Sequence, residues 1–268
     1  MMRRFLKMHG LGNDFVVFDA RGQALALSGA QVRGLADRHT GIGCDQLIVI
    51  ETSTRANAFM RIYNADGGEV EACGNAARCV ATLLGATATI DSAAGLLDAG
   101  ATADAATIVY PPPRFGWDEI PLGYAMDTRD MPVAWDELEH PVAVNVGNPH
   151  IVFFVDDVAA VPLNVIGPLI EHDALFPQRI NVNVAQIVAR DHLRLRVWER
   201  GVGLTRACGT GACASAVAAM RRGLTERKVT VDLPGGALVI EWRDDGHIAM
   251  TGPAATAFAG EVDPDAFA

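Results

Sequence analysis

The sequence predicts an α+β protein made of two homologous domains related by a pseudo-twofold axis. Three observations support this prediction. Two stretches of the chain match at one constant offset, strand-like segments outnumber helix-like ones, and each half carries Ala-Cys-Gly directly before an apolar helix. A cleft between two such domains would be a favoured position for a ligand site.

The repeat has an offset of 135 residues and needs no gaps. Cys73 lies in the first copy and Cys208 in the second, and 208 − 73 = 135. The same number separates Asn13 from Asn148, each of which follows a glycine. Polar residues outside the hydrophobic pattern also coincide, namely Gln46 with Asn181 and Asn64 with Glu199. Because one register is kept over so long a stretch, we interpret the halves as homologous.

Local patterns give the elements in order. Strand character is found at 15–18, 47–50, 59–63, 107–110, 151–155, 182–188, 193–198, 229–233, 237–242, 247–250 and 257–262. Helices are expected at about 30–38, 74–85, 164–172 and 209–222, and Asp-Gly or Gly-Gly turns at 66–68, 235–236 and 245–246. Three prolines at 111–113 mark a boundary, so we expect an N-terminal domain over 1–114, completed by a strand within 256–268, and a C-terminal domain over 115–255.

Composition excludes several classes of protein. The 268 residues are 50% hydrophobic and 20% charged, which is typical of a globular protein. A net charge of −10 with scattered basic residues argues against nucleic acid and anionic membranes as partners. The absence of a long apolar stretch or a leader-like N-terminus predicts a soluble, cytoplasmic protein. The two lysines, Lys7 and Lys228, lack a glycine-rich context, so a pyridoxal-phosphate site is poorly supported.

Five cysteines are present, and their number and spacing argue against disulfides and metals. An odd count without a secretion signal argues against a disulfide framework. The five cysteines are Cys44, Cys73, Cys79, Cys208 and Cys213. The paired spacings, 79 − 73 = 6 and 213 − 208 = 5, share no helix face and differ from zinc motifs, so no metal is expected. We interpret Cys44, Cys79 and Cys213 as small core residues.

Cys73 and Cys208 carry the chemistry that the pattern suggests. Each stands where a helix begins, so unpaired N–H groups and the helix dipole are expected to lower the thiol pKa and to bind a carboxylate. A racemase that uses two bases needs such a pair, because one group removes a proton from one face and the other delivers a proton to the opposite face. The two helix N-termini would stabilise the enolate-like charge, so no cofactor would be required.

Further segments resemble those of the diaminopimelate epimerase family. The resemblance covers about residues 5–262, and Cys44 and Leu204 depart from the family's usual pattern. The matching motifs are His9-Gly10-Leu11-Gly12-Asn13-Asp14-Phe15, Gly41-Ile42-Gly43, Asp45-Gln46, Tyr63-Asn64-Ala65-Asp66-Gly67, Ala72-Cys73-Gly74-Asn75, Gly147-Asn148-Pro149-His150, Arg179-Ile180-Asn181, Glu199-Arg200-Gly201 and Ala207-Cys208-Gly209-Thr210-Gly211.

The resemblance implies a fold, an activity and an assembly. Each pseudo-symmetric domain would be a mostly antiparallel, barrel-like sheet around a central helix, with the active site in the cleft between domains. The expected reaction interconverts LL- and meso-diaminopimelate without a cofactor, in bacterial lysine and peptidoglycan synthesis. A small-molecule substrate and a homodimer are expected as partners.

The resemblance also implies a role for each matched residue. The expected acid and base are Cys73 and Cys208. The reacting carboxylate would be held by Gly74, Asn75, Gly209 and Thr210, and the distal amino-acid end by Asn13, Asn64, Asn148, Asn181 and Arg200. The reacting end, with its amino group, would be lined by Gln46, His150 and Glu199.

Two other function classes remain open at this stage. A proline racemase-like or phenazine-biosynthesis-like isomerase would keep the fold and change the distal contacts, which the Asn64 and Glu199-Arg200 motifs disfavour. A thiol redox or ligand-binding protein would use Cys73 and Cys208 as a disulfide pair, but it would leave the set of asparagines unexplained.

Overall fold

The computed structural model describes residues 1–267, which form two compact units. Unit 1 comprises Met1–Ile108 and the residues from Gly252 onward, and unit 2 comprises Val109–Thr251. Both units are rich in strands and contain few helices, so the expected α+β class is confirmed. Within residues 1–267, none of the helices has the length and apolar character that crossing a membrane requires.

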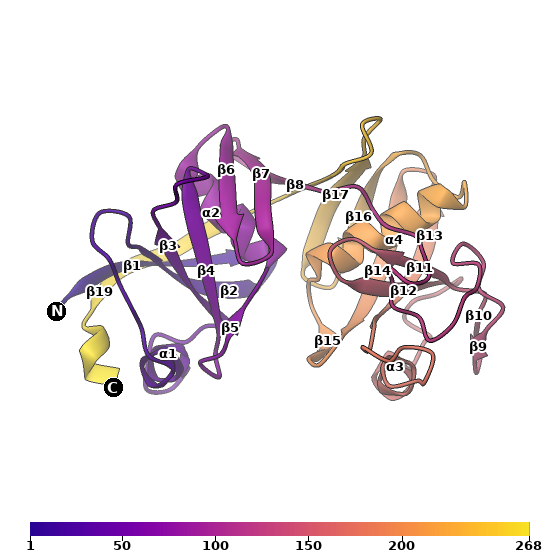
Figure 1. Cartoon of the computed structure of the whole chain (residues 1–268), viewed down its shortest axis with the longest axis horizontal. Helices are drawn as coiled ribbons and strands as arrows, with labels where there is room; N and C mark the ends of the chain where they lie inside the picture. The colour runs from indigo at the N-terminus through magenta and orange to yellow at the C-terminus, as the bar shows by residue number, and fades with distance from the viewer. Residues whose placement is uncertain (268) are drawn as a thin grey trace. The chain divides into compact units, whose positions relative to one another are not determined.

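Unit 1 begins and ends with two strands that pair with each other (Figure 1). The C-terminal strand β19 runs antiparallel to β1, so the end of the chain completes the sheet formed by its beginning. The elements of unit 1 are β1 (Arg3–Gly10), β2 (Asn13–Asp19), α1 (Gly29–Ala36), β3 (Gln46–Glu51), β4 (Ala58–Asn64), β5 (Glu69–Val70), α2 (Gly74–Leu84), β6 (Ala88–Ser92), β7 (Gly95–Ala101), β19 (Ala255–Val262) and the 3-10 helix η1 (Pro264–Phe267).

Unit 2 repeats this order of elements after a long irregular entry. Strands β8 (Ala106–Tyr110) and β18 (Ile248–Gly252) contain the two points at which the chain passes between the units. The other elements of unit 2 are β9 (Ala134–Trp135), β10 (Leu138–Glu139), β11 (Val142–Asn145), β12 (Pro149–Phe154), α3 (Leu163–Glu171), β13 (Asn181–Ala189), β14 (His192–Glu199), β15 (Gly203–Thr205), α4 (Gly209–Arg221), β16 (Lys228–Leu233) and β17 (Gly236–Trp242).

The strand registers obey the 135-residue offset. In unit 1, Phe15 pairs with Gln46 across the parallel strands β2 and β3, and in unit 2, His150 pairs with Asn181 across β12 and β13. The offset holds across both partners, since 150 − 15 = 135 and 181 − 46 = 135. The antiparallel pairs β3–β4 and β13–β14 agree in the same way, as do β4–β5 and β14–β15. The two units are therefore built on one plan.

The shared register ends after the second helix of each unit. Ala58 on β4 pairs with Ile90 on β6, a separation of 90 − 58 = 32, whereas His192 on β14 pairs with Thr230 on β16, a separation of 230 − 192 = 38. Unit 2 therefore carries six extra residues between these strands. Because α4 is longer than α2, part of this insertion extends the helix itself.

Each unit buries apolar residues on both faces of its central strands. Val16 and Phe18 of β2 pack in one core with Val32 and Leu35 of α1, while the alternate residue Val17 faces the opposite side and is equally buried. A capping box at Ser28 fixes the start of α1. In unit 2 the equivalent positions Ile151, Phe153, Val182 and Val184 pack with Leu163, Ile166 and Ile170 of α3. The outer helices α1 and α3 therefore cover the same face of their sheets.

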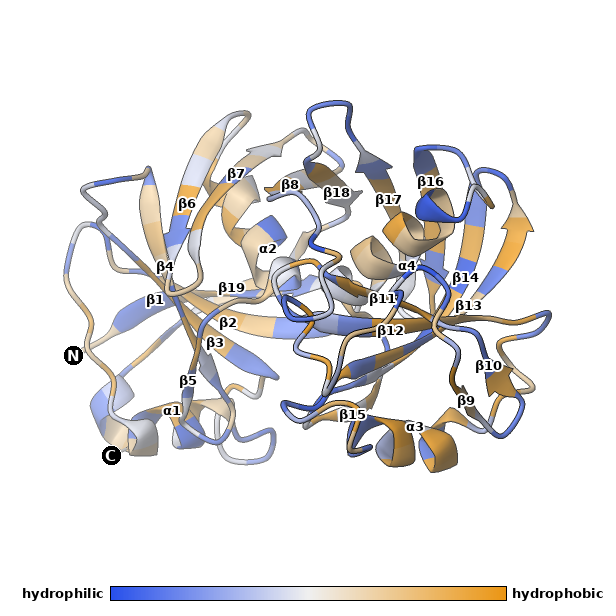
Figure 2. Ribbon diagram, turned by 45° about the vertical axis from the view of Figure 1, so that its right-hand side comes forward, coloured by the Kyte–Doolittle hydropathy of each residue, from blue (hydrophilic) through white to orange (hydrophobic). Residues whose placement is uncertain are grey.

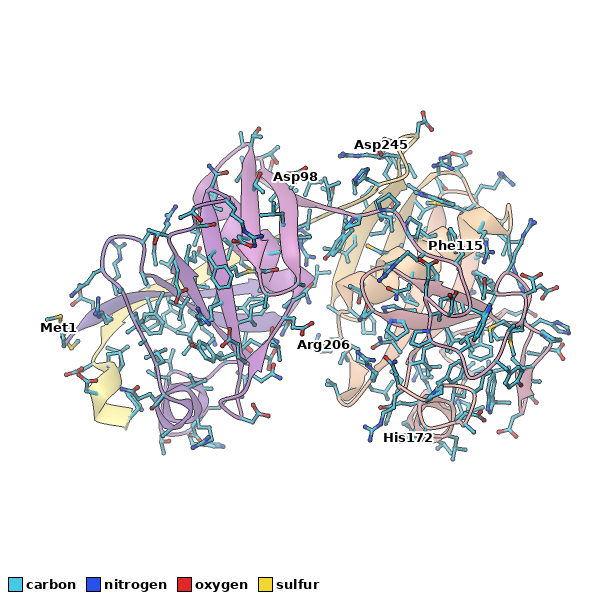
Figure 3. The ribbon with its side chains drawn as sticks, in the orientation of Figure 1. Met1, Asp98, Phe115, His172, Arg206 and Asp245 are labelled. Carbon is cyan, nitrogen blue, oxygen red and sulfur yellow. The ribbon has the colours of Figure 1, made fainter. Side chains whose placement is uncertain are left out.

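The second helix of each unit lies against several strands, as the expected central helix should. Helix α2 packs against β1, β6 and β7, and α4 packs against β11, β12, β13, β14, β16 and β17. Nearly every residue of α4 is buried, which fits its run of alanines and its lack of hydrophilic colouring over most of its length in Figure 2. At the far end of α4, the guanidinium of Arg221 lies 4.3 Å from the ring centre of Phe115 (Figure 3).

All four helices occur where the periodicity placed them, within two residues at each end. The turn at 245–246 also forms, with Asp245 at the tip of the β17–β18 hairpin (Figure 3) and Gly246 at a φ of 88°. The strands that the sequence did not predict are β1, β5, β6, β7, β9, β10, β11 and β15. Strands β1, β6 and β7 contain charged residues, glycines or alanines, and the others are only two to four residues long, so these segments form strands because neighbouring strands pair with them.

Candidate active site

Cys73 is the residue that precedes helix α2. Its backbone is extended, with φ −151° and ψ 112°, and Gly74 is the first helical residue. The thiol donates a hydrogen bond to Oδ1 of Asn13 at 3.8 Å. The first N–H groups of a helix have no partner within the helix, so Gly74 and Asn75 present donors at this point. The thiol and a potential anion site therefore lie side by side in unit 1.

Asn13 and Asn75 are joined directly to each other. Nδ2 of Asn75 donates to Oδ1 of Asn13 at 3.1 Å, and the Nη2 group of Arg78 donates to Oδ1 of Asn75 at 2.8 Å. Because a guanidinium only donates, the orientation of the Asn75 amide is fixed. Nδ2 of Asn13 in turn donates to Asp45 at 2.9 Å. Asn13, expected at the distal end of the substrate, thus lies beside the thiol.

Arg78 was not predicted as a site residue. It is fully buried on α2, where the other buried residues except Asn75 are apolar, and a charged side chain inside an apolar helix pattern was the available signal. A Cβ atom at Gly10 would lie 3.0 Å from Nη2 of Arg78, so glycine at that position leaves room for the guanidinium. The absence of a side chain at Gly10 therefore allows Arg78 to reach Asn75.

Gln46 and Asn64 also form a pair, on neighbouring antiparallel strands. Their residues are in register on β3 and β4, and Nε2 of Gln46 donates to Oδ1 of Asn64 at 2.9 Å. Oε1 of Gln46 is buried without a hydrogen-bond partner among residues 1–267. The expectation placed these two side chains at opposite ends of the substrate, whereas the structure joins them.

Cys208 precedes α4 as Cys73 precedes α2. Gly209 is the first helical residue, and the N–H of Gly211 donates to the sulfur at 3.3 Å. Oγ1 of Thr210 lies 3.6 Å from the same sulfur. A Cβ atom at position 211 would lie 3.2 Å from the sulfur and 2.8 Å from Oδ1 of Asn183, so only glycine fits there. The first turn of α4 therefore directs one N–H donor at the sulfur of Cys208 and places the Thr210 hydroxyl beside it.

The pKa of Cys208 is raised, and the sequence expectation of a lowered value is wrong for this thiol. Burial is the largest cause and the neighbouring carboxylate of Glu199 adds to it, while the hydrogen bonds from Thr210 and Gly211 act in the opposite direction. Burial likewise raises the pKa of Glu199, which accepts a hydrogen bond from Thr205 at 2.5 Å. The helix start supplies donors to the thiolate, but desolvation and a nearby negative charge outweigh them.

His150 lies fully buried on β12 between two amides. Its Nε2 atom is 2.9 Å from Oδ1 of Asn148, and its Nδ1 atom is 3.1 Å from Nδ2 of Asn183. Burial lowers the pKa of His150 to about 3, so the ring is neutral near pH 7. Asn148 also donates to Oγ1 of Thr210 at 3.3 Å. His150 is therefore connected to the first turn of α4 through Asn148.

Asn181 and Arg200 are linked through the backbone. Nδ2 of Asn181 donates to the carbonyl of Pro149 at 2.9 Å, and its Oδ1 atom accepts from the N–H of Arg200 at 3.0 Å. The side chain of Arg200 is exposed, and Nη1 donates to the carbonyl of Gln178 at 3.1 Å. Asn181 thus sets the path of the chain at Arg200, while the arginine side chain is exposed.

The three remaining cysteines are buried, as expected of core residues. Burial raises the pKa of Cys44 to about 11 and that of Cys79 to about 12, so both are thiols at neutral pH. Across residues 1–267, no three histidine, cysteine or acidic side chains come together in a way that could hold a metal ion. Arg206, labelled in Figure 3, lies in the connection that leads from β15 to Cys208.

Comparison with known proteins places these features in a family. The family model described as diaminopimelate epimerase matches residues 5–110 and 142–257. A diaminopimelate epimerase of Erythrobacter litoralis is 62% identical over 260 residues, covering 97% of this chain and 97% of that protein. One from Rhizorhabdus wittichii is 60% identical over 268 residues, covering 100% of this chain and 98% of that protein.

Solved structures share the fold at low sequence identity. A phenazine biosynthesis protein of the PhzF family from Bacillus anthracis has a TM-score of 0.70 at 16% identity, covering 98% of this chain and 99% of that one. A hydroxyproline epimerase from Agrobacterium vitis has a TM-score of 0.67 at 16% identity, covering 99% and 94%. At these identities the likeness establishes a common architecture and nothing about substrate.

Proposed function

This chain belongs to the diaminopimelate epimerase family, and from that membership we propose that it interconverts LL- and meso-2,6-diaminopimelate by moving the α-proton between the thiols of Cys73 and Cys208. No cofactor takes part. The observation that carries the proposal is the pair of cysteines at equivalent helix starts, in a chain 62% identical to a diaminopimelate epimerase. We assign the reaction to bacterial lysine and peptidoglycan synthesis, in a cytoplasmic homodimer.

The proton transfer requires one thiolate and one thiol. The thiolate takes the α-proton, so the C–H bond breaks, an S–H bond forms and the electron pair passes into the carboxylate as an enolate-like species. The second thiol then gives its proton to the opposite face of the carbon. Reversal of direction exchanges the two roles. Because each cysteine approaches from one face only, inversion follows from having two groups.

The reacting carboxylate is bound at the two helix starts in this proposal. Gly74 and Asn75 would donate from α2, and Gly209 and Thr210 from α4. Backbone donors that are already oriented stabilise developing negative charge at little cost in reorganisation, and a helix N-terminus favours an anion. The positions of both cysteines directly before the first residues of α2 and α4 support the assignment.

Because the pKa of the Cys208 thiol is raised, the bound substrate must help to deprotonate it in this proposal. The carboxylate of Glu199 contributes to that raised pKa. In the proposed complex the α-ammonium group of the substrate lies beside Glu199 and compensates its charge, which lowers the pKa of Cys208 and makes its thiolate accessible. Gln46 and His150 complete the reacting end, with His150 neutral because its pKa is about 3.

The distal amino-acid end is assigned to the amides and to Arg200. A guanidinium can bind a carboxylate through two parallel hydrogen bonds, and the exposed head of Arg200 has donors available for it. Asn64 would contact the same end. In the structure, Asn13 accepts from the thiol of Cys73, Asn148 donates to the hydroxyl of Thr210, and Asn181 accepts from the N–H of Arg200. In the proposal these three amides also contact the substrate.

Hydrogen exchange tests the proposal against its alternatives. The protein is mixed with LL-diaminopimelate in deuterated water. Early product should carry deuterium at the α-carbon while recovered substrate carries little, because the donating thiol has already exchanged with solvent. A redox protein would give neither epimerisation nor exchange. A related isomerase would turn over proline or another substrate in place of diaminopimelate, and that outcome would refute the assigned substrate.

A further inference from the structure

Asn183 on β13 is a fully buried amide that no expectation assigned to the site. The two N–H groups of Nδ2 are shared among three acceptors, the carbonyl of Ile151 at 2.9 Å, that of Asn181 at 3.3 Å and Nδ1 of His150 at 3.1 Å. Carbonyl oxygens only accept, so Nδ2 must face them and the amide has one orientation. Oδ1 then points toward Gly211 and has no hydrogen-bond partner among residues 1–267. A buried acceptor left without a partner destabilises the fold, which calls for another reason to keep it.

The orientation of Asn183 determines where His150 carries its proton. Because Nδ2 of Asn183 donates to Nδ1 of His150, that ring nitrogen must be the acceptor and carry no proton. A neutral imidazole has one N–H group, so the proton is on Nε2. The Nε2–H group therefore donates to Oδ1 of Asn148 at 2.9 Å. Replacing Asn183 by an apolar residue would leave both tautomers open.

The hydrogen bonds between His150 and the sulfur of Cys208 keep the same donor-to-acceptor direction. With its oxygen accepting from His150, Asn148 uses Nδ2 to donate to Oγ1 of Thr210 at 3.3 Å. The Thr210 hydroxyl accepts that bond and keeps its own proton for the sulfur of Cys208, 3.6 Å away. Four successive hydrogen bonds thus run in one direction, from Asn183 to Cys208. Bonds aligned in this way polarise one another.

The first unit shows that the fold does not need these polar residues. Subtracting the repeat offset, 150 − 135 = 15, 183 − 135 = 48 and 211 − 135 = 76, which gives Phe15, Ile48 and Ala76. All three are fully buried apolar residues. Unit 2 has replaced this apolar trio by His150, Asn183 and Gly211, and glycine is the change that admits the amide oxygen. Packing alone does not account for the replacement.

We propose that Asn183 is a positioning residue that keeps the proton of His150 on Nε2 and so directs the hydroxyl of Thr210 at the sulfur of Cys208. The proposal rests on the proposed role of Cys208 in proton transfer. Asn183 itself touches neither the sulfur nor the reacting carbon in this scheme. Its effect passes through His150, Asn148 and Thr210.

Nitrogen-15 NMR of histidine-labelled protein tests the proposal without substrate. The His150 signals, identified by their loss in His150→Asn, should show a neutral ring protonated at Nε2 between about pH 5 and pH 8. Asn183→Ile, which installs the side chain found at position 48, should change this pattern to a mixture of tautomers. A wild-type ring protonated at Nδ1 or on both nitrogens overturns the proposal even if Asn183→Ile does not fold.

Kinetics with a matched control give the second readout. Asn183→Ile should lower kcat at least tenfold and leave KM within threefold, because the substrate's own contacts remain. Ile48→Val alters the equivalent position of unit 1 and should leave both kcat and the His150 spectrum near wild type. A folded Asn183→Ile protein with wild-type kcat refutes the positioning role. If the wild type does not act on diaminopimelate, the proposed function fails while the NMR result still decides the tautomer.

Discussion

Thr205 donates its hydroxyl proton to Oε1 of Glu199 at 2.5 Å, between the adjoining strands β15 and β14. The equivalent residue of the first unit is Val70, since 205 − 135 = 70, so this bond exists only in unit 2. It opposes the effect of burial, which raises the pKa of Glu199. The hairpin therefore helps to keep ionised a carboxylate that lies beside Cys208.

Thr205→Val should raise the pKa of Glu199 further, because the carboxylate loses a donor that favours its charged form. The acid limb of the profile of kcat/KM against pH should move to higher pH. Thr230→Val, on β16 of the same unit, is the matched control and should leave the limb in place. An acid limb unmoved by Thr205→Val would show that Glu199 does not control the reaction's pH dependence.

Glu199→Gln should stabilise the protein at high pH and not at low pH. The folded-state pKa of Glu199 is raised, so stability falls as pH rises from the unfolded pKa of about 4.3 to the folded-state value, while below the unfolded pKa both states are protonated. The gain in Tm over wild type should therefore be near zero at about pH 4 and reach a few degrees at about pH 8. Glu137→Gln, at an exposed position, should show no such trend.

Arg200→Lys should reduce kcat/KM at least tenfold, which corresponds to about 1.4 kcal/mol. An ammonium group cannot replace the two parallel donors of a guanidinium, and the backbone bond from Arg200 to Asn181 is unaffected by the change. Steady-state kinetics with LL-diaminopimelate measure the loss, with Arg194→Lys on the exposed side of β14 as control. Unchanged kinetics would make Arg200 a structural residue.

Cys73→Ala and Cys208→Ala should each abolish epimerisation while preserving the fold. Each change removes one small side chain at a helix start, and a single remaining base would return the proton to the face it left. Serine at either position should retain slight activity at most, because a hydroxyl is a far weaker base than a thiolate. Polarimetry or chiral chromatography measures turnover, and circular dichroism checks the fold.

The buried core residue Cys79 provides the control for these substitutions. Cys79→Ala should keep wild-type activity, with a modest loss of stability from the vacated volume. Near-normal turnover by Cys208→Ala would leave one base acting alone, and our interpretation of the second Ala-Cys-Gly motif would then be wrong.

The repeat made most of the fold predictable. A fixed offset and the helical period located α1, α2, α3 and α4, because apolar spacing reflects which side of a helix meets a sheet. Strands such as β6 and β7, which lack strong propensity, were not predicted, since they form by pairing with each other and, for β6, with β4 about thirty residues earlier in the chain. The placement of both cysteines at helix starts was likewise readable from Ala-Cys-Gly and the apolar runs behind it.

The sequence by itself determined the two-unit plan, the helix starts at Cys73 and Cys208 and the membership of a family, because these depend on local pattern and on residue identity. Only the tertiary structure decided the electrostatics. Burial and the carboxylate of Glu199 raise the pKa of Cys208 where the motif alone predicted a lowered one. The hydrogen bonds of Arg78 with Asn75 and of Asn183 with His150 were also found only in the tertiary structure. Desolvation and hydrogen-bond direction depend on neighbours that sequence spacing does not reveal.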